Sequence, residues 1–164
     1  IGGQSQVIKL RWGGSMDDLK CANAPAQIKF ALGENVKQSN WRDRHTTRYP
    51  QTRMGVEQIV RDEFQAAREY ARRWKSFSRT HRGMPPRRDL ELDAIAEVLD
   101  GKRNIQCHSY RADEILALMR TCEDYGIRVT CFQHILEGYK VASEMAKAGT
   151  PCSVASIAAA TVPE

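Results

Sequence analysis

The chain is 164 residues long and 41% hydrophobic, which is enough to bury one sizeable core, so we expect a single compact domain or a piece of a larger one. It contains no run of about 18 apolar residues that would span a bilayer, and its first residues have neither a start methionine nor a signal-peptide layout. The formal charge of +5 raises nucleic acid as a partner, because clustered Lys and Arg side chains bind phosphates.

Two short apolar runs lie in the first part of the chain. QVIKLRW at residues 6–12 and QIKFALG at residues 27–33 are predicted strands. A polar segment at residues 34–54, which shows no clear period, follows as a predicted loop. A structureless connection of this length is uncommon in a compact domain, so we expect the segment to be functional or flexible.

Two amphipathic helices are predicted in the middle of the chain, at residues 56–74 and 92–99. A basic loop at residues 76–88, which carries one glycine and a Pro-Pro break, is expected between them. The stretch REYARRWKSFSRTHRGMPPRR, residues 68–88, is densely basic with aromatic residues interleaved. Such a stretch is most often a solvated helix end and loop, and we favour that interpretation over a nucleic-acid site.

From residue 103 onward the sequence alternates between strand and helix patterns. NIQCHSY and IRVTCFQH are predicted strands, each followed by a helix that ends at a glycine, and a last short apolar run lies at residues 153–157. In the second helix the expected buried stripe is Ile135, Tyr139, Ala142 and Ala146. Strands joined by crossover helices are parallel, and parallel sheets need cover on both faces or closure into a barrel. The predicted fold class is therefore α/β.

The cysteines indicate a reducing compartment. There are five, an odd number without any C-x-x-C pair, and most lie in apolar runs: Cys21, Cys107, Cys122, Cys131 and Cys152. We expect buried, reduced thiols in a cytoplasmic protein with no membrane partner.

Two histidines occupy equivalent places on consecutive strand-to-helix units. His108 in NIQCHSY and His134 in VTCFQH each close an apolar run and precede a helix, at a separation that matches one βα repeat. The carboxyl ends of parallel strands lie at the edge where α/β enzymes carry their active sites, and neighbouring strands are about 4.8 Å apart. Two imidazoles placed in this way can share one ion. The sequence therefore predicts a metal site, and the alternative is two unrelated strand-end histidines.

The same segments resemble a known family. NIQCHSYRADEILALMR and VTCFQHILEGYKVASEMAKAG resemble the fifth and sixth strand units of the metal-dependent amidohydrolase superfamily. QIKFALGENVKQSNW and RYPQTRMG resemble its bacterial imidazolonepropionase-like or prolidase-like branch. The resemblance covers about residues 4–149. It implies a partial (β/α)8 TIM barrel, roughly strands four to seven with their helices, so that residues 1–164 form an incomplete barrel domain with an atypical end at residues 150–164.

The resemblance also implies a set of metal ligands. His108 and His134 take the ligand positions of strands five and six around one or two divalent ions, most often zinc. For the ligand of the fourth strand we prefer Glu34, because a carboxylate binds a cation without modification. Lys29 and Lys9 are the alternatives, because the superfamily often uses a carboxylated strand lysine.

The reaction that the resemblance implies is hydrolysis of a C–N bond, in an amide or a cyclic amide, by a metal-activated water. The first-strand His-x-His pair and the eighth-strand Asp, which is the usual general base, have no counterpart in the sequence, so no catalytic residue is assigned. We expect this chain to be inactive alone, and we expect either that the gene product is truncated or that a second copy or another chain completes the barrel. The expected substrate is a small-molecule amide, whose carboxylate Tyr49 and Arg53 would approach unless they only support the start of a helix.

The remaining candidates have simpler explanations. His45 and His81 lie in polar, Arg-rich loops and are expected to be solvated. A Cys107–His108 nucleophile and base pair is disfavoured, because neighbouring residues on a strand point to opposite faces. The alternative to a hydrolase is a non-catalytic basic domain that binds nucleic acid or an acidic partner through residues 68–88.

Overall fold

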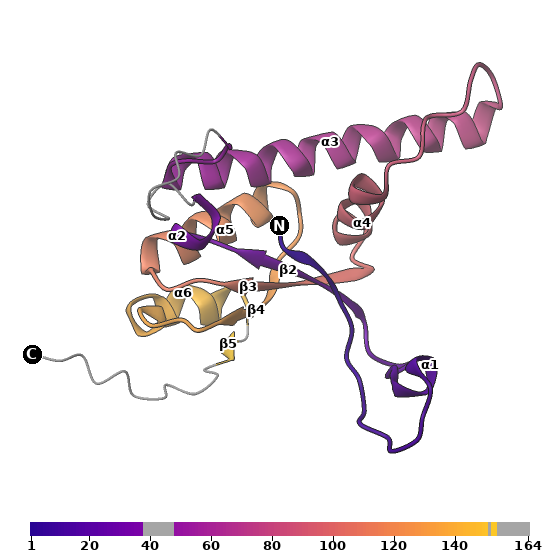
Figure 1. The fold of residues 1–164 in the computed structure, drawn as a ribbon. Helices are drawn as coiled ribbons and strands as arrows, with labels where there is room; N and C mark the ends of the chain where they lie inside the picture. Colours follow the sequence, from indigo (N-terminus) through magenta and orange to yellow (C-terminus); the bar gives the residue numbers. More distant parts are fainter. Residues whose placement is uncertain (38–47, 151, 154–164) are drawn as a thin grey trace, which may run out of the picture.

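The computed structural model describes residues 1–37, 48–150 and 152–153. Its strands form one sheet in the order β1-β2-β3-β4-β5, in which β2 to β5 are parallel and β1 is antiparallel to β2. The strands are β1 (Gly3–Ser5), β2 (Ala26–Ala31), β3 (Arg103–His108), β4 (Val129–Gln133) and β5 (Cys152–Ser153). The helices are α1 (Met16–Leu19), α2 (Glu34–Lys37), α3 (Arg53–Thr80), α4 (Leu90–Leu99), α5 (Ala112–Asp124), the 3-10 helix η1 (Gly138–Val141) and α6 (Ala142–Lys147) (Figure 1).

The sheet has one apolar and one polar face, because side chains alternate along each strand. In β2 and β3 the apolar residues of the alternation, such as Phe30 and Cys107, are buried, whereas Lys29 and His108 between them are only half-buried. The buried side chains join those of α3, α4, α5 and α6 in one hydrophobic cluster. The α/β class is therefore confirmed. The described strands form an open sheet, so the closed (β/α)8 barrel stays a prediction.

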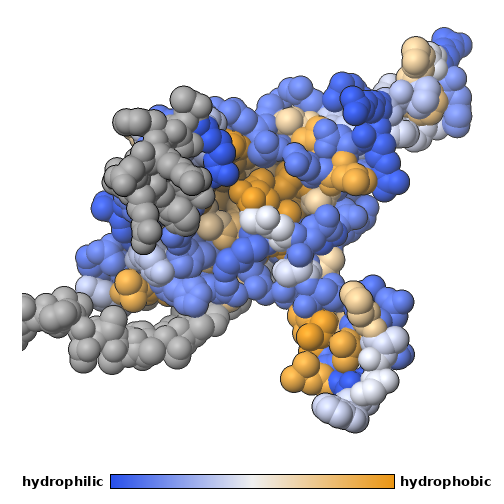
Figure 2. Space-filling view, viewed as in Figure 1, coloured by the Kyte–Doolittle hydropathy of each residue, from blue (hydrophilic) through white to orange (hydrophobic). Residues whose placement is uncertain are grey.

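The predicted strand at residues 6–12 is wrong. The N-terminal strand is β1, and within 6–12 only Ile8 pairs, in an isolated bridge to Lys20. Leu10 and Trp12 are almost fully exposed, so the apolar run has no core to pack on within the described residues. Residues 6–25 instead form an arm that leaves the body of the molecule and carries apolar side chains at its surface (Figures 1 and 2).

The helix α3 is longer than predicted. It begins at Arg53, where the hydroxyl of the N-cap residue Thr52 accepts a hydrogen bond from the Gly55 amide (2.9 Å), and it ends where His81 adopts a left-handed conformation. The predicted basic loop at 76–88 thus begins only after Thr80. After Gly55 in the first turn, the sequence contains no glycine or proline until Gly83, so nothing stops the helix earlier. The helix α4 matches its prediction.

The predicted loop at 34–54 is partly helical. It begins with the short helix α2 and ends with the first residues of α3. Residues 38–47, which include His45, lie outside the described part of the chain. The four residues of α2 follow Gly33, whose φ of 71° turns the chain sharply at the end of β2.

The predicted helix after β4 is wrong in its phase. The chain first forms the 3-10 helix η1, which buries Gly138 and Val141, and then α6, which buries Met145. Tyr139, an expected core residue, is 76% exposed. A 3-10 turn holds 3.0 residues instead of about 3.6, so the buried stripe shifts away from the positions that an uninterrupted α-helix would bury.

The prediction of buried, reduced thiols is confirmed in part, for the cysteines that the structure describes. Cys21, Cys107, Cys122 and Cys131 are free, and burial raises the pKa of the Cys122 thiol to about 12 and that of Cys107 even further. Cys21 and Cys131 are half-buried.

Within the described ranges, no helix combines the length and the apolar character needed to cross a membrane.

Candidate metal centre

The two histidines of the sequence pattern lie side by side at the carboxyl ends of adjacent strands. His108 is the last residue of β3, and His134 follows β4 directly with a left-handed backbone (φ 57°). Their ring centroids are 5.1 Å apart. Because β3 and β4 are parallel neighbours, the two imidazoles leave the sheet at the same edge.

Burial and nearby charges lower the pKa of His108 and so favour its neutral form. Burial lowers the pKa of its imidazole, and the nearby charges of His134 and Lys29 lower it further. The Asn35 Nδ2 atom of α2 donates a hydrogen bond to His108 Nε2 (2.8 Å), and the Tyr110 ring packs edge-on at 4.5 Å between centroids. A neutral imidazole is the form that binds metal ions. A ligand at Nε2 would replace the hydrogen bond from Asn35.

A row of polar side chains crosses the same face of the sheet. Lys29 Nζ donates to Gln133 Oε1, Gln133 Nε2 donates to Gln106 Oε1 (2.8 Å), and Gln106 Nε2 donates to Gln27 Oε1 (2.6 Å). Gln133 also pairs in register with His108. Of the three candidate third ligands, Lys29 is therefore the one that shares the face of the histidines. The glutamines and Asn35 were not among the predicted site residues, although the alternation of polar residues along the strands was a signal for the former.

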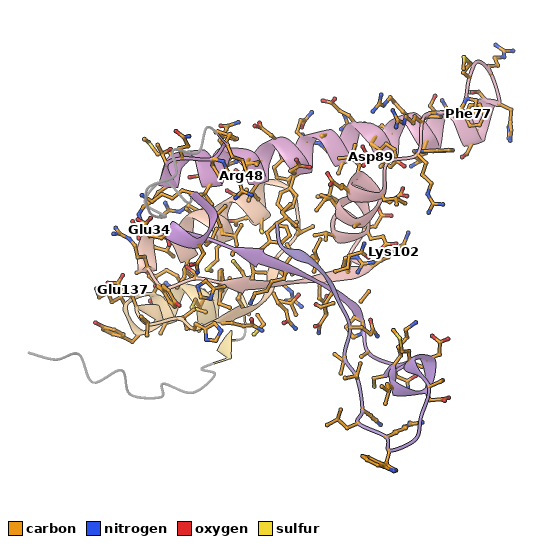
Figure 3. The ribbon with its side chains drawn as sticks, viewed as in Figure 1. Glu34, Arg48, Phe77, Asp89, Lys102 and Glu137 are labelled. Carbon is orange, nitrogen blue, oxygen red and sulfur yellow. The ribbon has the colours of Figure 1, made fainter. Side chains whose placement is uncertain are left out.

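The other two candidate ligands lie elsewhere. Glu34 is on α2 at the end of β2, where its Oε1 atom binds Lys37 Nζ at 2.9 Å and Arg53 Nη2 at 3.4 Å (Figure 3). Lys9 is an exposed residue of the arm. In residues 1–37, 48–150 and 152–153, no group of three or more His, Cys, Asp and Glu side chains is placed to hold a metal ion. The structure thus brings the two histidines together without Glu34.

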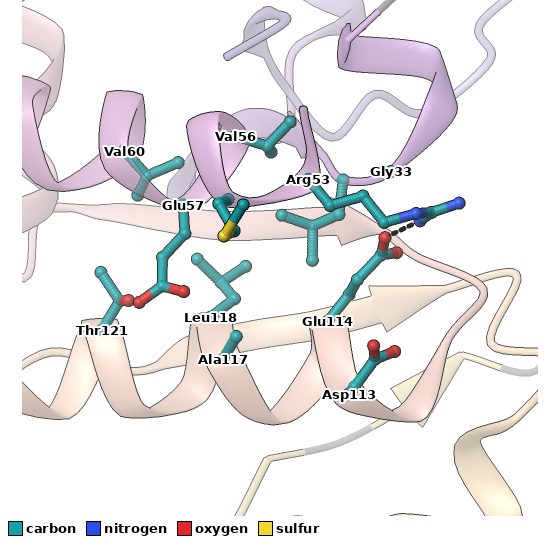
Figure 4. A pocket seen from close by; sticks show the side chains of 12 residues that line it. Gly33, Arg53, Val56, Glu57, Val60, Asp113, Glu114, Ala117, Leu118 and Thr121 are labelled. Carbon is teal, nitrogen blue, oxygen red and sulfur yellow. Dashed lines mark hydrogen bonds and ion pairs between the residues drawn. The ribbon is translucent and has the colours of Figure 1, made fainter. Parts of the chain in front are cut away.

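The two predicted substrate contacts lie at the start of α3. The Arg53 guanidinium binds the carboxylate of Glu114 (Figure 4) and that of Glu34, so two acidic groups already match its charge. Tyr49 is half-exposed and packs beside Gly55, where a Cβ atom would approach the Tyr49 ring at 3.2 Å. Both residues therefore support the N-terminus of α3 in this conformation.

Two further candidates lie away from the histidine pair. His81 ends α3 and packs on Phe77, with ring centroids 6.0 Å apart. Cys107 is fully buried in the core on the opposite face of β3 from His108, as the strand alternation predicts.

Comparison with known proteins supports a coarse assignment. An amidohydrolase from Thermotoga maritima MSB8 has a solved structure that matches with a TM-score of 0.78 and 28% sequence identity. The chain resembles an amidohydrolase. The match to the T. maritima amidohydrolase covers 93% of this chain and 38% of that one, so the chain spans little more than a third of its length. No family model and no curated protein matches the sequence.

Proposed function

We propose that the chain is part of a hydrolase that cleaves C–N bonds of small amides or cyclic amides, and that His108 and His134 are ligands of its divalent metal. The observation that carries the proposal is the 5.1 Å distance between the two imidazole rings at the carboxyl edge of a parallel sheet. The likeness to an amidohydrolase supports it. Two imidazoles suit zinc, in a site of one or two ions.

Lys29 is the third ligand in this proposal, ahead of Glu34. It lies on the polar face, its charge acts on His108, and its Nζ atom contacts Gln133. An ammonium group has no lone pair, so Lys29 would serve only after carboxylation of its amine. Glu34 would first have to release Lys37 and Arg53.

The residues of this chain would hold and orient the reacting groups. Asn35 fixes the ring of His108, and the glutamine row keeps the face around Lys29 polar. When bound, a divalent ion supplies Lewis-acid chemistry, because it makes water more acidic and polarises a carbonyl group. We further propose that β2 to β5 are strands four to seven of a (β/α)8 barrel in the imidazolonepropionase-like or prolidase-like branch, and that the rest of a longer or partner chain supplies the remaining ligands and the base.

Metal analysis tests the proposal. The full-length protein, purified without chelator, is expected to contain about one or two equivalents of zinc. Loss of an outer contact to a metal ligand typically weakens metal binding by about 10-fold to 100-fold. A His108→Ala, His134→Ala double variant removes two ligands, so its metal affinity should fall by more than that. His81→Ala, a histidine away from the pair, is the matched control and should keep its metal. A wild-type protein that neither contains nor takes up divalent metal would refute the site.

A second candidate function rests on the exposed end of α3. Arg72, Lys75 and Arg79 recur at helical spacing on one exposed face, and none of them has an ion pair within the described residues. The opposite face carries Tyr70 and Trp74, which pack edge-to-face at 6.3 Å. The chain would in that case bind nucleic acid or an acidic partner through this basic stripe.

Salt titration separates this candidate from the hydrolase. If the three cations bind phosphates, affinity for a generic DNA duplex should fall about 40-fold between 50 and 200 mM salt. Reversing Arg72, Lys75 and Arg79 to Glu should abolish binding, whereas reversing three exposed lysines elsewhere, Lys20, Lys102 and Lys147, should leave most of it. Absence of binding to both the duplex and poly-glutamate at low salt would exclude this function.

A further inference from the structure

A crevice of about 240 Å³ lies on the helix side of the sheet, between α3 and α5 (Figure 4). It opens beside Gly33, at the end of β2, and it is lined by residues from both helices. Four of the lining side chains are apolar and buried: Leu32, Val56, Val60 and Leu118. None of the lining residues belongs to the histidine site, which lies on the opposite face of the sheet.

The charges at the crevice favour a cation. Three carboxylates line it, those of Glu57, Asp113 and Glu114, against the single guanidinium of Arg53. Arg53 is bound to Glu114, while the partners of the other two carboxylates, Arg61 and Arg111, are not among the lining residues. The local excess of negative charge attracts cations and repels anions.

One polar group in the crevice lacks a partner. Thr121 is 0% exposed, and its Oγ1 atom has no hydrogen-bond partner among the described residues. A buried hydroxyl without a hydrogen-bond partner lowers the stability of the folded protein. A ligand that hydrogen-bonds to it would remove this free-energy cost. Figure 4 shows the Thr121 and Glu57 side chains at the same end of the crevice, reaching in from facing helices. Both can accept hydrogen bonds, which suits a donor-rich group.

We propose that this crevice binds a small protonated amine with a compact apolar body. The body would lie against Val56, Val60 and Leu118, and the ammonium group would donate to Glu57 and Thr121. A cavity of about 150 Å³ holds benzene, so this crevice has room for a ligand of about ten heavy atoms. The proposal concerns a site separate from the one that binds metal and does not depend on the hydrolase function.

Binding of three probes of similar size tests the charge selectivity. We expect benzylamine to bind the full chain in a saturable way, detected by NMR chemical-shift changes. It should bind about tenfold more tightly than toluene, which lacks the donor, and benzoate should bind least. Equal binding of benzylamine and benzoate, equal binding of benzylamine and toluene, or no saturable binding of any probe would overturn the proposal.

Variants locate the binding to the crevice. Ala117→Leu adds a side chain into the space and should abolish benzylamine binding, whereas Ala146→Leu on the exposed face of α6 should not. Thr121→Val keeps the shape of the side chain and removes the hydroxyl, so it should weaken benzylamine about fivefold or more and leave toluene unchanged. Unaltered benzylamine binding in both Ala117→Leu and Thr121→Val would place the amine elsewhere and end the proposal.

Discussion

Phe64→Ala is expected to destabilise the protein by about 3 to 5 kcal/mol, the usual cost of truncating a fully buried phenylalanine. Phe64 is completely buried in α3, and its ring packs on Phe30 of β2 at 6.0 Å and on Tyr125, just after α5, at 5.2 Å. It thus joins the long helix to the sheet and to the end of α5. Removing the ring leaves a cavity that three separate elements would have to close.

Denaturant unfolding measures this effect as a shift of the midpoint. Phe77→Ala is the matched control, because Phe77 lies on the same helix but is only half-buried near its exposed end (Figure 3). Its loss should cost about 1 kcal/mol. Similar costs for the two variants would contradict the position of Phe64 at the centre of the core.

Lys29→Met is expected to weaken zinc binding by more than about 100-fold, the upper end of what loss of an outer contact costs, whereas Glu34→Gln and Lys9→Met should leave it within about twofold. The reason is the position of Lys29 on the polar face, with its charge felt by His108 and its Nζ atom at Gln133. Glu34 is held by Lys37 and Arg53, and Lys9 belongs to the arm.

Competition titration with a chromogenic chelator, with the three variants side by side, provides the dissociation constants. Because the lysine would act as a carboxylated amine, removal of bicarbonate should weaken zinc in the wild type and have no effect on Lys29→Met. A loss confined to Glu34→Gln would instead make Glu34 the third ligand.

The strands of the C-terminal half and the helix α5 could be predicted, because short alternating runs and a one-faced helix leave a strong periodic signal. The same alternation predicted that Cys107 and His108 point to opposite faces. The approach of His108 to His134 followed from parallel pairing alone.

Local pattern failed where tertiary contacts decide. The apolar run that contains Trp12 looks like a strand, yet no partner strand covers it in the described part of the chain. Tyr139 is exposed because a 3-10 turn changes the spacing after β4, which no periodicity reveals in advance. The role of Glu34 as a metal ligand stays a prediction, because its residue type could not reveal that its carboxylate binds Lys37 and Arg53 in this conformation.

We expect the pairing of β2 with β3, which brings Lys29 to the histidine face, to form late in folding. Gln27 and Arg103, which hydrogen-bond across this pair, are 76 residues apart in sequence, with α3 and α4 between them. Closing so long a loop costs chain entropy that only the completed sheet repays, whereas the contacts of helices with their sequence neighbours form early. Lys29 and Gln133 are further apart still, at 104 residues. Their contact therefore reports completed folding, and we expect partly folded states to keep their helices while this polar face is still unformed.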